Sequence, residues 1–284
     1  MRRRDVGTDI VNPRLTPLGW VGLVAVVVFG CLPTYWLVAT ALMPREEVFA
    51  PNRSFLPRAI SLESFRTFSG NAELMQNLLN SVIVSSLTAI LSVVVSILAA
   101  YSLSKFRYRG RGALMVLLLS GQLFPGALLL ISLYLLLNTV GLLYTYTGLV
   151  LAFTTFTLPL TVFLLKGFFD ALPDEILEAA RLDGASNLAV LRRIALPLVA
   201  PGIATAGLFG FMRGWNDLLF ALTLGGQDKR TLPAGLVQTF IYQGAADWPA
   251  LMAASIVTSL PIVVTFVILQ RFLVSGLSAG AVKG

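Results

Sequence analysis

The sequence predicts an all-α polytopic membrane protein with six transmembrane helices, and three observations support this fold class. Of its 284 residues, 56% are hydrophobic and only 12% are charged, and the mean hydropathy is +0.82. Soluble domains are about 25% charged, so this chain has too few polar groups to cover a surface that faces water. Its charged residues are also separated by uncharged runs longer than the about 20 residues that cross a bilayer.

Six segments are long and apolar enough to be membrane helices. They are predicted at residues 17–43, 78–103, 113–136, 146–167, 198–222 and 250–272. The third and fourth share one uncharged run between Arg111 and Lys166, in which Asn138, Gly141 and residues 145–147 supply the turn.

The first helix is predicted to be retained rather than cleaved. Three arginines, Arg2–Arg4, precede its apolar stretch, as they do in a secretory signal peptide. The apolar region of a signal peptide is only about 7–15 residues long, and this one is much longer. We therefore expect residues 1–16 to form a cytoplasmic N-terminal segment and residues 17–284 to form a single transmembrane domain.

The positive charges predict the orientation in the membrane. One face carries 14 of the 21 lysines and arginines, on the N-terminus, residues 104–112 and 168–197 with the flanking Lys166, and the C-terminal end from Arg271; the opposite face carries six, and Arg213 lies between. Cytoplasmic loops are enriched in these residues, so both termini are expected in the cytoplasm and the chain in the cell membrane as a multi-pass protein. We interpret the net charge of +7 as membrane topology and predict no nucleic-acid binding; the membrane lipid is a partner.

The composition also excludes several kinds of chemistry. The chain has no histidine, which removes histidine acid–base catalysis and most zinc sites. Its single cysteine, Cys31, cannot form an internal disulfide. No Gly-Lys dipeptide occurs, so a phosphate-binding P-loop is absent from the sequence. We expect a chain that is not an enzyme and that carries no cofactor or metal.

The segment 168–197 is longer than a turn requires and is predicted to form two short helices. Pro173 suits the first helical position, and Gly184 suits a helix C-terminus. Ser186 is a natural N-cap for the second helix, and Pro197 is expected to open the fifth membrane helix. Two interpretations follow from the pattern: docking to a partner protein, or lying on anionic lipid as an amphipathic surface helix.

This segment resembles the EAA loop of the membrane subunits of type I ABC importers. The matching residues are Glu178, Ala179, Ala180, Gly184, Ile194, Leu196 and Pro197. Weaker features resemble the maltose-type second permease of the sugar-importer branch: Asn80-Ser81, residues 99–112, Trp215-Asn216 and residues 276–284. One departure is Asp217, where the family commonly has glutamate.

The resemblance implies the type I ABC importer permease fold and a set of partners. These are a second homologous permease in a heterodimer, two cytoplasmic ATPase subunits, an external solute-binding protein and a sugar or oligosaccharide substrate. ATP and Mg²⁺ would be bound by the partner ATPase. The ATPase-coupling residues implied are Glu178 as polar anchor, Ala179 and Ala180 as the close-packing face, Gly184 as the turn, and Arg181, Asp183, Ile194, Leu196 and Pro197.

Polar residues inside the predicted helices are candidates for the substrate path. They are Gln122, Thr154, Thr155, Arg213, Trp215, Asn216 and Asp217. Simpler interpretations are an i,i+4 ion pair of Arg213 with Asp217 near the outer boundary and threonines that bond within the membrane helices. Gly210 and Gly214 form a GxxxG pattern that is expected to pack against the second permease.

Three rival functions have different sequence requirements. An ion-coupled secondary transporter is expected to bury carboxylates in mid-membrane, where only Asp217 is a candidate. A membrane hydrolase needs a nucleophile with a base, and the absence of histidine disfavours it. A permease of an ABC importer for another solute class shares the EAA loop, so the loop does not exclude it.

Overall fold

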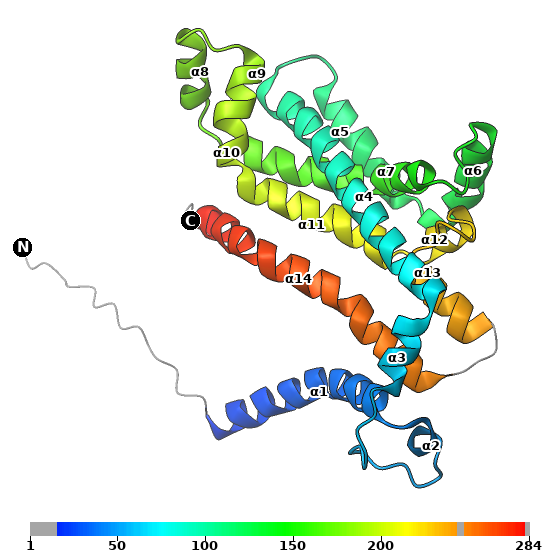
Figure 1. Cartoon of the computed structure of the whole chain (residues 1–284). Helices are drawn as coiled ribbons and strands as arrows, with labels where there is room; N and C mark the ends of the chain where they lie inside the picture. Colours follow the sequence, from blue (N-terminus) through cyan, green and yellow to red (C-terminus); the bar gives the residue numbers. More distant parts are fainter. Residues whose placement is uncertain (1–15, 243–246, 282–284) are drawn as a thin grey trace, which may run out of the picture.

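A computed structural model of the chain describes residues 16–242 and 247–281, and all regular structure in these ranges is helical (Figure 1). The helices are α1 (Pro17–Leu42), α2 (Arg45–Val48), α3 (Glu63–Gly70), α4 (Ala72–Lys105), α5 (Arg111–Ser120), η1 (Gly121–Leu123), α6 (Gly126–Thr139), α7 (Tyr146–Asp170), α8 (Asp174–Leu182), α9 (Asn187–Val190), η2 (Leu191–Ala195), α10 (Leu196–Leu198), α11 (Ala200–Asn216), α12 (Leu219–Leu224), α13 (Leu232–Val237), η3 (Gln238–Tyr242) and α14 (Trp248–Ala281). The predicted roles of residues 1–15 and of the last three residues lie outside the described residues.

The six predicted membrane helices correspond to four continuous helices and two bent pairs. Helices α1, α4, α7 and α14 are each long and apolar enough to cross a membrane. The third predicted helix, 113–136, is not continuous, because α5 with η1 and α6 meet at an angle of 102°. Pro125 stands at this break as the cap of α6, where its ring and missing N–H disfavour continuation of the preceding helix. The fold class is all-α, as predicted.

The fifth predicted helix, 198–222, is also corrected by the structure. Helix α11 ends at Asn216, Asp217 has an extended backbone, and α12 follows as a separate short helix. At the other end, residues 187–198 and α11 meet at an angle of 81°. The membrane part of this span is therefore α11, and the preceding helical residues belong to the segment between α7 and α11.

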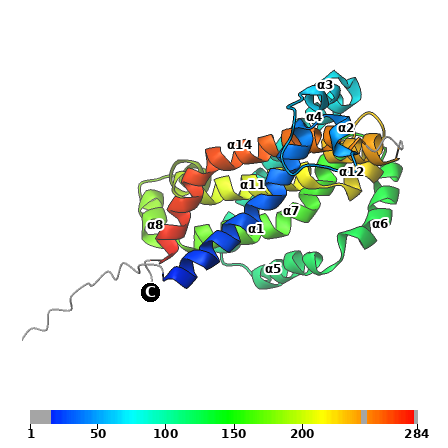
Figure 2. The ribbon, with the colours of Figure 1, turned by 90° about the horizontal axis from the view of Figure 1, so that it is seen from below.

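Helix α4 forms the centre of the bundle. It has 34 residues, about 51 Å at 1.5 Å per residue, and so extends beyond a hydrocarbon core about 30 Å thick. It begins at Ala72, six residues before the predicted start, because the side chain of Asn71 accepts hydrogen bonds from the backbone N–H groups of Glu73 and Leu74. Helices α7 and α11 pack along it, α14 packs on α11, and α1 packs on α14 (Figures 1 and 2).

The GxxxG pattern of α11 packs inside the chain rather than against a second permease. A Cβ atom added at Gly210 would lie 2.8 Å from the Cα of Ala89, and one added at Gly214 would lie 2.8 Å from the Cα of Ser85. Real Cβ atoms do not approach backbone so closely, and glycine is therefore required at both positions. The small residues bring the backbones of α4 and α11 together, which corrects the sequence prediction.

The segment between α12 and α14 is held to α4 by Asn80 and Ser81. The side-chain amide of Asn80 donates to the carbonyls of Asp228 (3.0 Å) and Arg230 (2.9 Å), and the Ser81 hydroxyl accepts from the backbone N–H of Leu232 (2.7 Å). The oxygen of Asn80 also accepts from the hydroxyl of Tyr146 at 2.7 Å. These bonds satisfy a buried amide and fix the start of the segment that contains α13.

Candidate functional site

The first helix of the segment between α7 and α11 is defined by residues that terminate it at both ends. Pro173 is the residue before the helix rather than its first residue, and Asp174 and Glu175 occupy the first turn, where the helix dipole favours acids. Gly184 has φ +86°, a left-handed conformation that favours glycine and ends the helix. Ser186 caps α9 through its hydroxyl, which accepts from the N–H of Ala189.

The second helix is longer than predicted and contains a π-helical turn. Helix α9 continues through η2 and α10 as far as Leu198, and the chain then bends at Val199. Pro197 lies inside this helix and does not open the membrane helix, whereas Pro201 lies in the first turn of α11. The prediction for Pro197 is therefore corrected: a proline is tolerated in a first turn, and Pro201 occupies that position in the membrane span.

We call residues 171–199 the coupling segment, after the role predicted for it from the sequence; its inner face is part of the apolar core at one end of the bundle. Leu177 is 1% exposed and packs in one apolar cluster with residues of α4, α7 and α11. That cluster also contains Val190, Leu191 and Ala195 from the second helix. Both helices of the segment are thus fastened to the membrane helices by burial of apolar surface.

The outer face of the coupling segment presents most of the predicted coupling residues. Glu178, Ala179, Arg181, Asp183, Gly184 and Pro197 are exposed, and Ala180, Ile194 and Leu196 are half-buried. Leu182 is 89% exposed, and Leu188 is also largely exposed. The sequence pattern placed both leucines in a helical repeat without showing that they point outward.

A hollow of about 390 Å³ lies in this outer face. It is lined by Ser186, Leu188, Ala189, Arg192 and Arg193, which come from the second helix of the coupling segment. An apolar floor flanked by two arginines suits an apolar group that lies beside a carboxylate.

A second cavity, of about 600 Å³, lies between the membrane helices. It brings together three predicted path residues, Gln122, Arg213 and Asn216, which come from η1 and α11. The amide of Gln122 donates to the backbone carbonyl of Phe156 on α7 at 2.8 Å. The bend between α5 and α6 opens this space, since Gly121, Pro125 and Gly126 are also among the residues that line it.

Arg213 and Asp217 form the predicted i,i+4 ion pair at the break between α11 and α12. Their closest nitrogen–oxygen distance is 3.3 Å, and Asp217 also accepts from the backbone N–H of Phe220 at 2.8 Å. The guanidinium group of Arg213 lies over the rings of Phe156 and Phe220, 5.6 and 5.7 Å from their centres. The carboxylate therefore caps α12 while it neutralises the arginine of the cavity.

The structure does not bring the remaining path candidates to this cavity. Thr154 is buried and Thr155 donates to the carbonyl of Leu151 on its own helix. Trp215 is fully buried, stacks on Phe211 and donates to the carbonyl of Thr258 on α14 at 3.0 Å. Its ring has no free face for a ligand in this conformation.

The sequence analysis missed the apolar lining of the cavity. Phe156, Leu160, Phe209 and Met212 line it together with the polar residues. No local pattern distinguishes these side chains from the apolar residues around them. Only the packing of α7 against α11 brings them together.

Comparisons with known proteins assign this arrangement to a family. The model of the family "Binding-protein-dependent transport system inner membrane component" matches residues 92–279. The chain belongs to this family. It is a membrane permease and not an enzyme, as predicted, and it works with a binding protein.

Relatives that are named as permeases of sugar transport systems support the same assignment over almost the whole chain. The chain is 35% identical to the diacetylchitobiose uptake system permease protein DasC of Streptomyces coelicolor, over 93% of this chain and 97% of DasC. It is 30% identical to the trehalose/maltose transport system permease protein MalG of Thermococcus litoralis, over 93% and 95%. The fold is similar to that of a chain in the crystal structure of a bacterial ABC transporter that imports alginate, with TM-score 0.78, 22% identity and coverage of 89% and 95%.

Proposed function

We propose that this chain is the permease subunit of an ABC importer that moves a sugar or oligosaccharide into the cytoplasm. The observation that carries the proposal is similarity along almost the whole chain to permeases named for saccharide uptake. The cavity is compatible with such a substrate, because its polar lining groups are amides and a neutralised arginine beside aromatic rings. A sugar needs both kinds of contact: hydrogen bonds for its hydroxyls and apolar faces for its ring.

The partners of the importer are a second permease in a heterodimer, two cytoplasmic ATPase subunits that bind ATP and Mg²⁺, and an external solute-binding protein. The coupling segment provides the ATPase contact, with Glu178 as polar anchor, Ala179 and Ala180 as close-packing face, and Leu182 and Leu188 as exposed apolar groups. Both termini and the coupling segment lie in the cytoplasm, in agreement with the distribution of positive charge.

Transport proceeds by alternating access. Binding of ATP closes the ATPase subunits, and their movement displaces the coupling segment. Because the buried inner face of this segment is part of the core of α4, α7 and α11, the displacement reaches the helices that line the cavity. The binding protein then delivers the solute from outside, and hydrolysis of ATP returns the cavity to the cytoplasmic side.

The test is recovery of partners from detergent-solubilised membranes with a tagged chain. Glu178→Lys combined with Gly184→Asp reverses an exposed charge and introduces a side chain at φ +86°; we expect loss of a co-purifying ATPase. Glu46→Lys is the control, since Glu46 is also exposed but lies on α2, which follows the first membrane helix on the side predicted to face outward.

The same preparation identifies the solute. The co-purifying binding protein is tested by calorimetry against maltose, trehalose and diacetylchitobiose, and saturable binding of a saccharide supports the proposal. In one outcome, an ATPase purifies with the wild-type chain while the binding protein recognises only another class of solute. That result would support the ABC importer function and refute the saccharide substrate. Failure to recover any ATPase with folded wild-type chain would refute the importer itself.

A further inference from the structure

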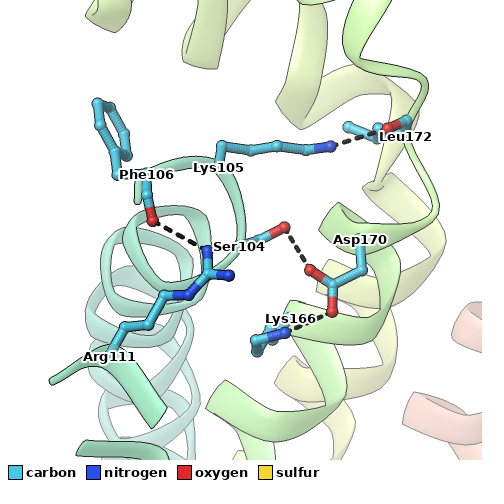
Figure 3. A network of polar contacts seen from close by, with 7 residues as sticks. All are labelled: Ser104, Lys105, Phe106, Arg111, Lys166, Asp170 and Leu172. Carbon is cyan, nitrogen blue, oxygen red and sulfur yellow. Dashed lines mark hydrogen bonds and ion pairs between the residues drawn. The ribbon is translucent and has the colours of Figure 1, made fainter. Parts of the chain in front are cut away.

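The cytoplasmic end of α4 makes polar contacts with the start of the coupling segment (Figure 3). Lys105 is the last residue of α4, and its ammonium group donates to the carbonyl of Leu172 at 2.8 Å and to the carboxylate of Asp174 at 2.7 Å. Leu172 belongs to the turn between α7 and α8, and Asp174 is the first residue of α8. One side chain of α4 therefore binds both the turn and the helix that follows it.

The side chain of Lys105 is largely buried where it makes these two contacts. Its side chain is only 6% exposed, whereas that of Asp174 is 69% exposed. An ammonium group removed from water needs acceptors in fixed positions, and loss of an acceptor leaves an uncompensated buried charge. The hydrogen bond and the charge of Lys105 lower the pKa of Asp174 below its usual range, so the carboxylate stays ionised to a lower pH than a free aspartate.

A second set of polar contacts joins the ends of α4 and α7 and does not include a residue of α8. Ser104 donates to one oxygen of Asp170 at 2.6 Å, and Lys166 donates to the other at 2.5 Å (Figure 3). Lys166 and Asp170 are both on α7. The chain thus contains two neighbouring lysine–aspartate pairs of similar chemistry, of which only the Lys105 pair crosses to the coupling segment.

We propose that Lys105 is a positioning residue that fixes the angle of α8 against the ends of α4 and α7, so that movement of the ATPase reaches these two helices. This inference deepens the proposed function and rests on it for the source of the movement. Burial of Leu177 holds α8 on the core, but apolar contact has no directional preference. The two hydrogen bonds of Lys105 supply the direction. Movement then enters the bundle both at Val199, where α10 bends into α11, and at Lys105.

The first measurement is hydrogen–deuterium exchange of the purified assembly in detergent, read on peptides that cover residues 172–184. Lys105→Met keeps the length of the side chain and removes its charge; we expect exchange in α8 to become about tenfold faster through local opening. Lys166→Met is the matched control and should leave α8 unchanged. Lys105→Arg, which keeps the charge and its donors, should restore most of the protection.

The second measurement is ATP hydrolysis by the reconstituted assembly with and without its binding protein. We expect Lys105→Met to retain the bound ATPase but to lose about tenfold of the stimulation by the binding protein, within the usual range of coupling between sites. Lys105→Arg should recover it. Loss of protection without loss of stimulation would overturn the role of Lys105 in transmission. Unchanged protection in α8 would overturn its role in positioning this helix.

A second variant, Asp174→Asn, tests the same contact from its other side. If Lys105→Met does not fold, Asp174→Asn removes only the charge of the exposed partner, and a smaller increase of exchange in α8 is expected; unchanged exchange there refutes the proposal. Exchange of α8 is measured on this chain whether or not an ATPase is recovered. A failure of the proposed importer function is therefore distinguishable from a failure of the positioning role of Lys105.

Discussion

The coupling segment and the membrane cavity are built in opposite ways. The coupling segment is nearly continuous in sequence, and its capping residues Pro173, Gly184 and Ser186 follow one another at short spacing. The cavity is assembled from η1, α7 and α11, whose residues are distant in the sequence. The comparison teaches that a local motif can identify the first site, while the second site depends on how three helices pack. Four predictions test this contrast.

The largest effect is expected within α8, where two leucines have opposite environments. Leu177→Ala removes a side chain that is 1% exposed and should lower the free energy of unfolding by about 2–5 kcal/mol. Leu182→Ala, at 89% exposure, should change it by less than about 0.5 kcal/mol and weaken only the ATPase contact. Thermal unfolding in detergent and co-purification separate the two effects; equal destabilisation would show that α8 does not pack as described.

The next effect concerns the ion pair beside the cavity. Arg213→Met leaves Asp217, whose side chain is only 9% exposed, without its cation. The expected loss of stability is about 1–3 kcal/mol, below that of a fully buried pair because Arg213 itself is 36% exposed. The double variant Arg213→Met with Asp217→Asn should recover part of this loss. If the double variant is as unstable as the sum of the single ones, the two groups do not interact.

A smaller effect is expected at the bend between α5 and α6. Gln122→Ala removes the hydrogen bond to the carbonyl of Phe156 and should lower the free energy of unfolding by about 0.5–1.5 kcal/mol. Thr155→Val, which removes a hydroxyl bonded within its own helix, is the control and should leave transport unchanged. Uptake assays of both variants decide whether the cavity is on the substrate path, and equal loss in both would remove Gln122 from it.

The smallest effect is the pH dependence of the Lys105–Asp174 contact. Because the pKa of Asp174 is lowered in the folded chain, its contribution is fully present above the unfolded pKa of about 3.9 and is lost as the pH falls through the folded value. Exchange in α8, corrected for intrinsic rates, should therefore be constant between about pH 5 and 8. A rise within this window would contradict a lowered pKa for Asp174.

The number and approximate positions of the membrane helices were predictable from composition. The breaks within these helices were harder to predict. Long uncharged runs are sufficient to identify membrane helices, because the bilayer imposes one requirement on every span. The bend at Pro125 had a partial signal, since proline inside a helix kinks or breaks it, but Pro33, Pro159 and Pro261 lie inside continuous helices of the same chain. The end of α11 before Asp217 had no such signal in the sequence. An aspartate within an apolar run is equally compatible with a helix that continues without a break.

The amino-acid sequence by itself determined the membrane class, the caps of the coupling segment and the family, because apolar content, cap residues and motif spacing act locally. Only the tertiary structure decided the partners of these residues. Gly210 and Gly214 pack on α4 rather than on another chain, Trp215 is buried, and Lys105 binds the start of α8 across about 70 residues of sequence. Such contacts arise from close packing of distant helices, which no local pattern specifies.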